Sequence, residues 1–354
     1  MVVFYIVLAI LLFGVLILVH EFGHFITAKL SGVQVNEFSL FMGPAIWKKQ
    51  RGETMYAIRC IPVGGYCAME GEDGDSDNPR AFSNAAWWKR FIILVAGAAM
   101  NFITGVVMIG IFLAPNKNYI LPQVSVVEEN CAFADYIQPG DTFVALDGEK
   151  IYVNSDFSLL MSLNSGDIHD LTIRRDGKII EYKNINMEMR EFPDDDGNPV
   201  LRYGFSFSLA ESTPGLWAKT TWKTSVDTVR LVRLSLKMLF TGQAGLRDVT
   251  GPVGIVQQMS NVAEASGSAW YAFLNLLYFG GFIAINLAVM NLLPIPALDG
   301  GRVVGLLLTA AVEGITRKKV NPNVEGYIHG VGMLLLLALM AVIMFKDIFF
   351  IVRG

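Results

Sequence analysis

Four long apolar stretches constrain the fold of this chain more than any other feature of its sequence. They cover residues 2–19, 91–114, 272–293 and 328–345, and the first is extended by the residues that follow it. A helix of about 20 mostly apolar residues can cross the hydrocarbon layer of a bilayer. Only 17% of the residues are charged, whereas soluble domains average about 25%. The sequence therefore predicts a polytopic α-helical membrane protein with about four spans.

Charge and cysteine content limit the function further. The formal net charge is −4 and no long run carries one sign, so we expect no nucleic-acid partner. The three cysteines, Cys60, Cys67 and Cys131, are too few and too scattered for a disulfide framework. We therefore expect packed thiols rather than a redox site.

Basic residues in the short connections predict the orientation of the chain. Lys and Arg concentrate in short cytosolic loops of membrane proteins. The connections after the first and third stretches both carry such residues, which are Lys29, Lys48, Lys49, Arg51, Arg59, Arg80, Lys89 and Arg90 in one and Arg302, Arg317, Lys318 and Lys319 in the other. Both connections are therefore expected to be cytosolic, which places both termini and the long segment 115–271 on the opposite side.

Part of this long segment has the pattern of a small soluble α+β module, at about residues 121–189. Short alternating runs predict strands, and Asp-Gly pairs between such runs are typical hairpin turns. The predicted elements are strands at 123–127, 141–146 and 169–173, turns at Asp147-Gly148 and Asp176-Gly177, and a short helix at 155–163.

Two later segments leave alternatives open. Residues 217–240 have helical spacing with interleaved basic residues, and this helix could lie on the outer membrane surface or pack on the module. The acidic loop 194–199 could bind calcium, but it lacks the spaced ligand pattern, so a solvated turn is favoured.

The strongest chemical signal is His-Glu-Phe-Gly-His at residues 20–24, in the first span. Residues four apart share one face of a helix, so His20 and His24 can offer ring nitrogens to one metal ion. Glu21 points to the adjacent face, where it could act as the catalytic base that takes a proton from water. Ionisable side chains are costly inside a membrane. A catalytic zinc site therefore explains them better than the alternative, a polar patch between helices.

A catalytic zinc site also needs a third protein ligand and one open position. Asp299 is the candidate, because it follows a membrane helix that is broken by Pro294 and Pro296. Irregular backbone at membrane depth is tolerated only beside protein or a wet cavity, and hydrolysis needs water. An ordinary capped helix end is the alternative. Lys29 is expected to mark the cytosolic interface, and it lies nine positions after His20. At about 1.5 Å per position, this puts the metal roughly 13 Å inside the cytosolic surface.

These motifs together resemble the site-2 protease family of intramembrane zinc metalloproteases, and within it the bacterial RseP-like branch. Residues 20–24 match the HExxH motif, and residues 291–301 match the NxxPxPxLDGG motif. The likeness covers most of the chain. Further matching segments are residues 61–66, which in the family form a membrane-associated β-hairpin, 88–102, 251–255, and 132–151, which are similar to part of a PDZ domain.

The resemblance implies a multi-pass enzyme of the bacterial inner membrane that cuts single-span membrane proteins within their membrane segments. Its expected substrates are anti-sigma factors and signal-peptide remnants, usually after another protease has cut them. One Zn²⁺ ion would be the cofactor. By the resemblance, Asn286 and Asn291 bind the substrate backbone, Pro294 and Pro296 shape the same loop, and Gly43 remains from a Gly-x-Gly motif near the substrate.

The hairpin could hold an opened substrate. A substrate helix must unwind locally before it is cut, and its freed amides need partners inside a membrane. Strand addition to a sheet edge can supply them. Met55 to Ile61 is the candidate edge strand, and a plain cytosolic hairpin is the alternative.

The chain departs from the family pattern at two points. Phe41 stands where related proteins often have the first glycine of Gly-x-Gly. The chain also has room for only one PDZ-like module, whereas some relatives carry two.

We therefore expect four parts: residues 1–114 with two spans and a hairpin at about 35–70, 115–210 as an extracytoplasmic PDZ-like domain, 211–268 as an amphipathic linker, and 269–354 with two spans. A metal or proton transporter and a catalytically dead scaffold are the competing functions. The absence of an evident inverted repeat argues against the transporter, and the intact Glu21 argues against the scaffold. His169 and His329 are expected to have surface or helix-end roles.

Overall fold

The computed structural model describes residues 2–72, 74, 76–164, 166–194, 196–245, 251–264, 268–316 and 322–353. It divides into two compact units. The first unit combines Met1–Phe112 with Thr228–Gly354, and the second is Leu113–Asp227. The four-part division expected from the sequence stays a prediction.

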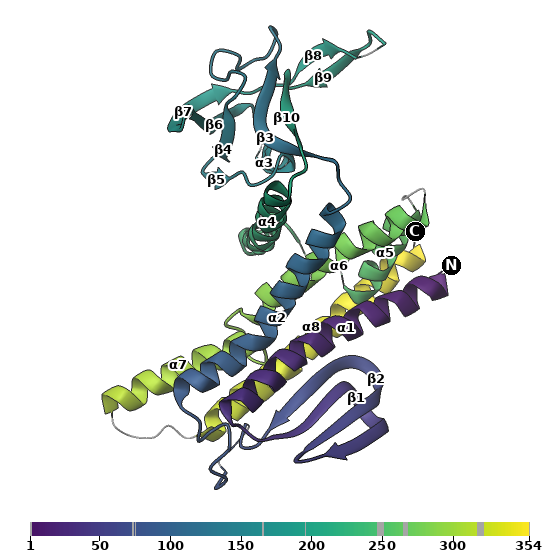
Figure 1. Ribbon diagram of the computed structural model, residues 1–354, viewed down its shortest axis with the longest axis vertical. Coiled ribbons are helices and arrows are strands. Elements are labelled where there is room, and N and C mark those ends of the chain that lie inside the picture. The colour runs from purple at the N-terminus through teal and green to yellow at the C-terminus, as the bar shows by residue number, and fades with distance from the viewer. Residues whose placement is uncertain are drawn as a thin grey trace. The chain divides into compact units, whose positions relative to one another are not determined.

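Long apolar helices dominate the first unit (Figure 1). They are α1 (Val2–Ser31), α2 (Trp87–Leu113), α6 (Ala269–Asn291) and α8 (Pro322–Arg353). Each contains a segment that is long and apolar enough to cross a membrane, namely Ile10–Ser31, Trp87–Leu113, Ala269–Asn291 and Gly330–Phe349. The prediction of about four spans is therefore confirmed. The remaining long helices are α4 (Pro214–Thr241), α5 (Pro252–Glu264) and α7 (Asp299–Thr316).

Glycines allow the backbones of these helices to approach closely, as small residues do at helix interfaces in membranes. A Cβ atom on Gly23 of α1 would lie 2.5 Å from the carbonyl oxygen of Ala96 on α2. On the next interface, a Cβ atom on Gly105 of α2 would lie 2.9 Å from the carbonyl oxygen of Gly281 on α6. The first contact brings α2 close to α1 beside the histidines, and the second brings α2 close to α6 further along the helix.

The hairpin of β1 (Val35–Arg51) and β2 (Thr54–Met69) folds into a four-stranded ladder, because both strands bend. Residues 35–40 of β1 pair with Met55–Ile58 on one side and with residues 65–69 on the other. Residues 47–50 pair with Met55–Ile58 on its remaining side. The prediction that Met55–Ile61 is an edge strand is therefore wrong. The outer strands are residues 45–51 and 65–69.

An apolar core fixes this hairpin to the helices. It contains Val35 and Met69 from the hairpin, Ala28 from α1, Ile93 from α2 and Leu306 from α7, all of which are buried. The strand of residues 65–69 is thereby held beside the part of α1 that carries the His-Glu-Phe-Gly-His motif.

A mainly antiparallel sheet forms the centre of the second unit, with the strand order β10-β3-β4-β6-β7 and β5 paired to β4. Its core is aromatic, with Phe143, Phe157 and Phe205 in mutual contact. The elements are β3 (Asn118–Val127), β4 (Thr142–Leu146), β5 (Glu149–Lys150), α3 (Ser155–Leu163), β6 (Ile168–Arg175), β7 (Lys178–Asn186) and β10 (Phe205–Glu211), with β8 (Arg190–Pro193) and β9 (Pro199–Arg202) as a separate ladder.

Most sequence predictions for this unit are confirmed. The helix α3 has its predicted bounds, and Asp147-Gly148 and Asp176-Gly177 both adopt the positive φ angles of type I′ hairpin turns. His169 differs from its expected surface role, because it is 2% exposed and bonds to Asp147 at 2.8 Å and to the carbonyl of Gly166. The side chain of His329 lies outside the described residues.

The structure also describes the two segments for which the sequence left alternatives open. The helix predicted at 217–240 is α4, and its residues up to Asp227 belong to the unit that contains the sheet. The acidic loop joins β8 to β9, where the Asp194 carboxylate accepts hydrogen bonds from the backbone amides of Asp196 and Asn198. This is the arrangement of a turn; Asp195 lies outside the described residues.

Candidate metal centre

Two imidazoles from one helix form the base of the site. His20 and His24 lie one turn apart on α1, with their ring centroids 4.9 Å apart and their Nε2 atoms 3.2 Å apart. His24 is 7% exposed. The predicted placement of both rings on one helical face is therefore present in the structure.

Asp299 brings a carboxylate to the same point. It is the first residue of α7, and its Oδ2 atom lies 3.1 Å from His20 Nε2 and 3.4 Å from His24 Nε2. Two ligands bound at ~2.0–2.1 Å to a tetrahedral ion are separated by about 3.3 Å. The three atoms thus have the mutual spacing of three corners of a zinc tetrahedron, and one corner remains for water or a substrate.

The hydrogen bonds of the site favour a cation at this point. His24 Nδ1 lies 2.8 Å from the carbonyl oxygen of Ile93, and a carbonyl only accepts, so the ring proton sits on Nδ1. In the neutral ring, Nε2 then presents a lone pair to Asp299. The buried Oδ2 of Asp299 accepts no hydrogen bond from the described residues. Lone pairs held this close repel one another unless a cation lies between them, so two nitrogens and one carboxylate oxygen fit a zinc ion.

Gly97 on α2 leaves the space that such an ion needs. A Cβ atom at this position would lie 2.7 Å from Cε1 and 2.8 Å from Nε2 of His20, and closer still to Nε2 of His24. A side chain here would fill the place where the two imidazoles converge. We assigned Gly97 no role from the sequence. The available signal was a glycine one helical turn before Asn101 in the second span.

A tight loop sets the position of Asp299. A Cβ atom on Gly301 would lie 2.9 Å from the carbonyl carbon of Ile295, and Ala297 adopts a φ angle of +77°, in the left-handed region that favours glycine. The side chain of Arg302, on the first turn of α7, pairs with Glu72 in the segment after β2. The loop and this ion pair together fix the start of α7.

Glu21 is half-buried and lies beside the hairpin. A Cβ atom on Gly65 would lie 3.2 Å from Cγ of Glu21 and 2.9 Å from Cγ2 of Ile17. The outer strand of residues 65–69 therefore packs against the helical face that carries Glu21. Residues 65–69 are therefore the edge strand that lies beside Glu21, the predicted base.

The five predicted substrate-binding residues lie at different places relative to the cluster of His20, His24 and Asp299. Asn291 is brought to the cluster, with its Nδ2 atom 3.4 Å from Nδ1 of His20. Asn286 lies on α6 without a described hydrogen bond to the cluster. Gly43 belongs to the hairpin, where it adopts a φ angle of +84° and its carbonyl accepts a hydrogen bond from Arg59. It makes no described contact with the histidines or Asp299.

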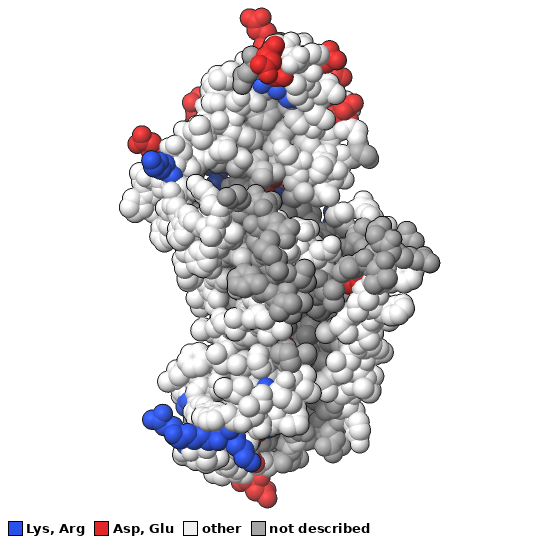
Figure 2. Space-filling view, turned by 90° about the vertical axis from the view of Figure 1, so that its right-hand side faces the viewer, with Lys and Arg blue, Asp and Glu red and all other residues white. Residues whose placement is uncertain are grey.

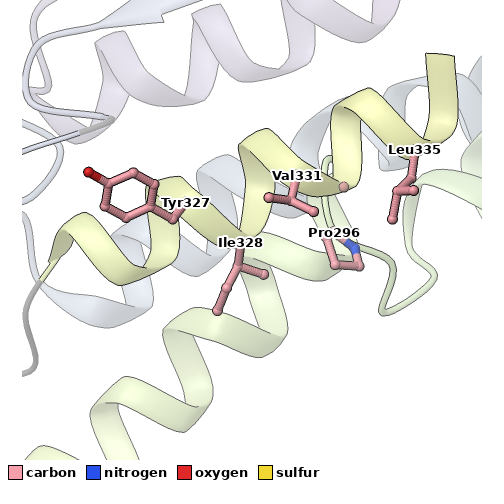
Figure 3. A pocket seen from close by; sticks show the side chains of 6 residues that line it. Pro296, Tyr327, Ile328, Val331 and Leu335 are labelled. Carbon is pink, nitrogen blue, oxygen red and sulfur yellow. The ribbon is translucent and has the colours of Figure 1, made fainter. Parts of the chain in front are cut away.

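The two prolines lie on the loop between α6 and α7. Pro294 is exposed, whereas Pro296 faces α8. Figure 3 shows Pro296 at the base of an apolar groove, opposite Val331 and Leu335 of that helix. A Cβ atom on Gly332 of α8 would lie 2.9 Å from the carbonyl carbon of Pro296. The loop that carries Asp299 is therefore packed directly against α8.

Asn101 is a further residue at the site to which we gave no role from the sequence. It is 1% exposed on α2, and its Nδ2 atom lies 3.3 Å from Nδ1 of His20. The signal in the sequence was a polar amide within an apolar span, where polar side chains are expensive.

Comparisons with known proteins indicate the family of this chain. The model of peptidase family M50 matches residues 8–339. A protein of Clostridium acetobutylicum named "Putative zinc metalloprotease" is 37% identical, and the alignment covers 98% of this chain and 97% of that protein. The "Regulator of sigma-W protease RasP" of Bacillus subtilis is 26% identical, with 96% and 97% covered. The "Zinc metalloprotease RasP" of Oceanobacillus iheyensis is 28% identical, with the same coverage.

The family match extends over nearly the whole chain, so the predicted relationship to site-2 proteases is confirmed. Together with the four apolar helices, it makes this chain a multi-pass membrane protein with the fold of a protease. The chain belongs to peptidase family M50, the site-2 protease family.

Proposed function

We propose that this chain is an intramembrane zinc endopeptidase, in which His20, His24 and Asp299 hold the metal and Glu21 is the catalytic base. The observation that carries the proposal is the convergence of Nε2 of both histidines and Oδ2 of Asp299 to 3.1–3.4 Å. The space beside Gly97 supports it. The identity of the metal is supported by the names of the relatives, two of which are called zinc metalloproteases.

When bound, zinc would supply Lewis acidity and bring the pKa of a water molecule to about 7. Glu21 then takes the proton of the attacking water and delivers it to the nitrogen of the leaving amine. Its position one residue after His20 keeps it near the metal but off the face that the two imidazoles share. Ile93 and the loop before Asp299 hold the ligands in place, so little reorganisation accompanies the reaction.

The proposed substrates are membrane segments of single-span proteins, which another protease has already shortened. Anti-sigma factors and signal-peptide remnants are the expected classes, and one relative is named "Regulator of sigma-W protease RasP". An unwound substrate needs hydrogen-bond partners at membrane depth. Residues 65–69, the outer strand beside Glu21, can provide them by strand addition, and Asn291 can donate a further hydrogen bond.

The proposed orientation places the metal toward the cytosolic side of the bacterial inner membrane. Lys48, Lys49 and Arg51 are exposed at the end of β1, as expected of a cytosolic connection. Figure 2 shows basic side chains gathered over the hairpin at the lower end of the face in view. Both termini and residues 115–210 would then be extracytoplasmic.

The second unit is proposed to be a PDZ-like module. Its five-strand sheet path with one short helix, α3, supports this assignment. Peptide binding and the exclusion or positioning of substrates are the two roles open to it.

The decisive experiment combines metal analysis with cleavage of a membrane-reporter peptide by purified protein. Glu21→Gln should keep about one zinc per chain and lose cleavage, because only the proton acceptor is removed. Asp299→Asn should lose both, because an amide is a weaker ligand than a carboxylate. Unchanged turnover in Glu21→Gln would reject the assigned base. Full zinc content in Asp299→Asn would remove Asp299 from the site.

A further inference from the structure

We propose that Asn101 is the positioning residue of His20, and that its amide oxygen accepts the proton on His20 Nδ1 and so presents Nε2 to the metal. This inference rests on the proposed zinc site. It assigns a role to a buried group that the reaction itself does not use.

The first observation is an unsatisfied atom. Asn101 is 1% exposed in the apolar helix α2, and its Oδ1 atom is buried without a hydrogen-bond partner among the described residues. A buried amide oxygen that lacks a donor is costly, so an arrangement that supplies a donor is favoured. The nearest described polar group of the cluster is the His20 ring, 3.3 Å from the other end of the same amide.

Rotation of this amide by 180° about Cβ–Cγ exchanges the two ends. Oδ1 would then face His20 Nδ1 in place of Nδ2, and the buried oxygen would gain its donor. A neutral imidazole carries one proton. When Nε2 is a metal ligand, that proton resides on Nδ1 and needs an acceptor. The rotated amide is therefore matched to the metal-binding tautomer of His20.

The other imidazole shows the same arrangement already formed. His24 Nδ1 donates to the carbonyl of Ile93, also on α2, at 2.8 Å. Ile93, Gly97 and Asn101 follow one another at intervals of four residues, so they share one face of the helix. On this face the carbonyl of Ile93 is the acceptor for His24, and Gly97 leaves space for the ion. The amide oxygen of Asn101 is the acceptor for His20.

Asn291 is the competitor for the same ring nitrogen, at 3.4 Å. One ring N–H makes one good hydrogen bond, so the two asparagines cannot both accept it. Asn291 is half-buried at the end of α6, next to the loop that carries Pro294. Asn101 is fully enclosed. Asn101 therefore serves His20, and the amide of Asn291 remains available for the substrate.

Zinc affinity of purified, full-length variants tests this assignment, measured by competition with a chelator. Asn101→Leu keeps the size of the side chain and removes the acceptor, so zinc should bind about ten- to a hundredfold more weakly. Asn101→Asp keeps an acceptor oxygen and should bind zinc at least as tightly as the wild type. Thr104→Val is the control, because among the described residues the Thr104 hydroxyl donates only to the carbonyl of Met100, one turn earlier in the same helix.

A merely structural role for Asn101 predicts the opposite order, since a buried carboxylate disturbs packing more than leucine does. Wild-type affinity in Asn101→Leu, or equal losses in the Leu and Asp variants, would overturn the inference. Asp299→Asn in the same assay reports on the site itself: unchanged affinity there contradicts the proposed function whatever Asn101 does. If the Leu variant does not fold, ¹⁵N NMR of the zinc-loaded wild type decides, since a His20 without a proton on Nδ1 refutes the proposal.

Discussion

Gly97 on α2 lies directly against the rings of His20 and His24 on α1, so closely that the space between the helices admits no side chain. A methyl group here would occupy the region where the imidazoles converge. Gly97→Ala should therefore displace the rings and lower turnover by about a hundredfold, the effect of a misplacement of roughly 1 Å. Zinc content and reporter cleavage of the purified variant measure this effect.

Gly105→Ala is the matched control for Gly97→Ala. It adds the same methyl group to α2 at a second close approach, against Ile285 and Gly281 of α6, away from the metal ligands. It should lower thermal stability and leave most of the zinc in place. Equal zinc losses in the two variants would show that general helix packing, rather than space at the imidazoles, explains the first result.

The two asparagines of α6 should differ in importance. Asn291→Ala removes an amide at the cluster and should slow cleavage about fivefold, the value of one hydrogen bond of about 1 kcal/mol. The loss should be largest for substrates with stable helices, because these need the most help to open. Asn286→Ala removes an amide without a described bond to the cluster and should have a smaller effect. Rates for a stable and an unstable reporter helix test both statements, and a uniform loss across substrates would contradict backbone binding.

Two glycines of α8 allow a direct comparison of packing. Gly332 faces Pro296, whereas a Cβ atom on Gly330 would meet no atom within 4 Å. Alanine favours a helix over glycine by up to about 1 kcal/mol, so Gly330→Ala should be neutral or stabilising. Gly332→Ala should be destabilised relative to it by about 1–3 kcal/mol, the usual cost of overpacking. Thermal unfolding provides the comparison, and equal stabilities would exclude the tight contact.

The hairpin turn should respond to acid. Hydrogen bonds from Arg80 and Lys29 lower the pKa of Glu53 from its ordinary 4.5 to about 2. Because the folded pKa is the lower one, this stabilisation is complete above about pH 4.5 and is lost as the pH falls toward 2. Glu53→Gln should cost about 1 kcal/mol of unfolding free energy at pH 7, and this cost should disappear as the pH falls below 2. Unfolding curves across this range would contradict the assignment if the difference stayed constant.

The parts of the fold that follow from local rules were predictable from the sequence. The spans follow from apolar length, and the Asp147-Gly148 turn follows from the backbone that a type I′ turn requires. Helical spacing alone placed His20 and His24 on one face. The role of His20, Glu21, His24 and Asp299 in catalysis stays a prediction until the variants are measured.

Features that depend on the tertiary packing of helices and strands could not be predicted from local sequence patterns. The contact of Gly97 with the histidines is set by the crossing of α1 and α2, which no pattern in either helix reveals. The hairpin bends twice, so Met55–Ile58 became an inner strand although its sequence is compatible with an edge. Phe41 adopts a φ angle of +69°, in the left-handed region that favours glycine, and its ring lies against Gly14 of α1. That conformation costs about 1–2 kcal/mol, and the contact with α1 offsets the strain.

The wide separation of Asp299 from the histidines along the chain matters for biosynthesis. His20 and His24 lie on α1, and Asp299 is the first residue of α7, which is synthesised much later. A nascent or prematurely terminated chain thus carries two of the proposed ligands without the third. The proposed metal site can therefore form only after α7 has been synthesised, and a fragment that ends before α7 would lack one of the three proposed ligands.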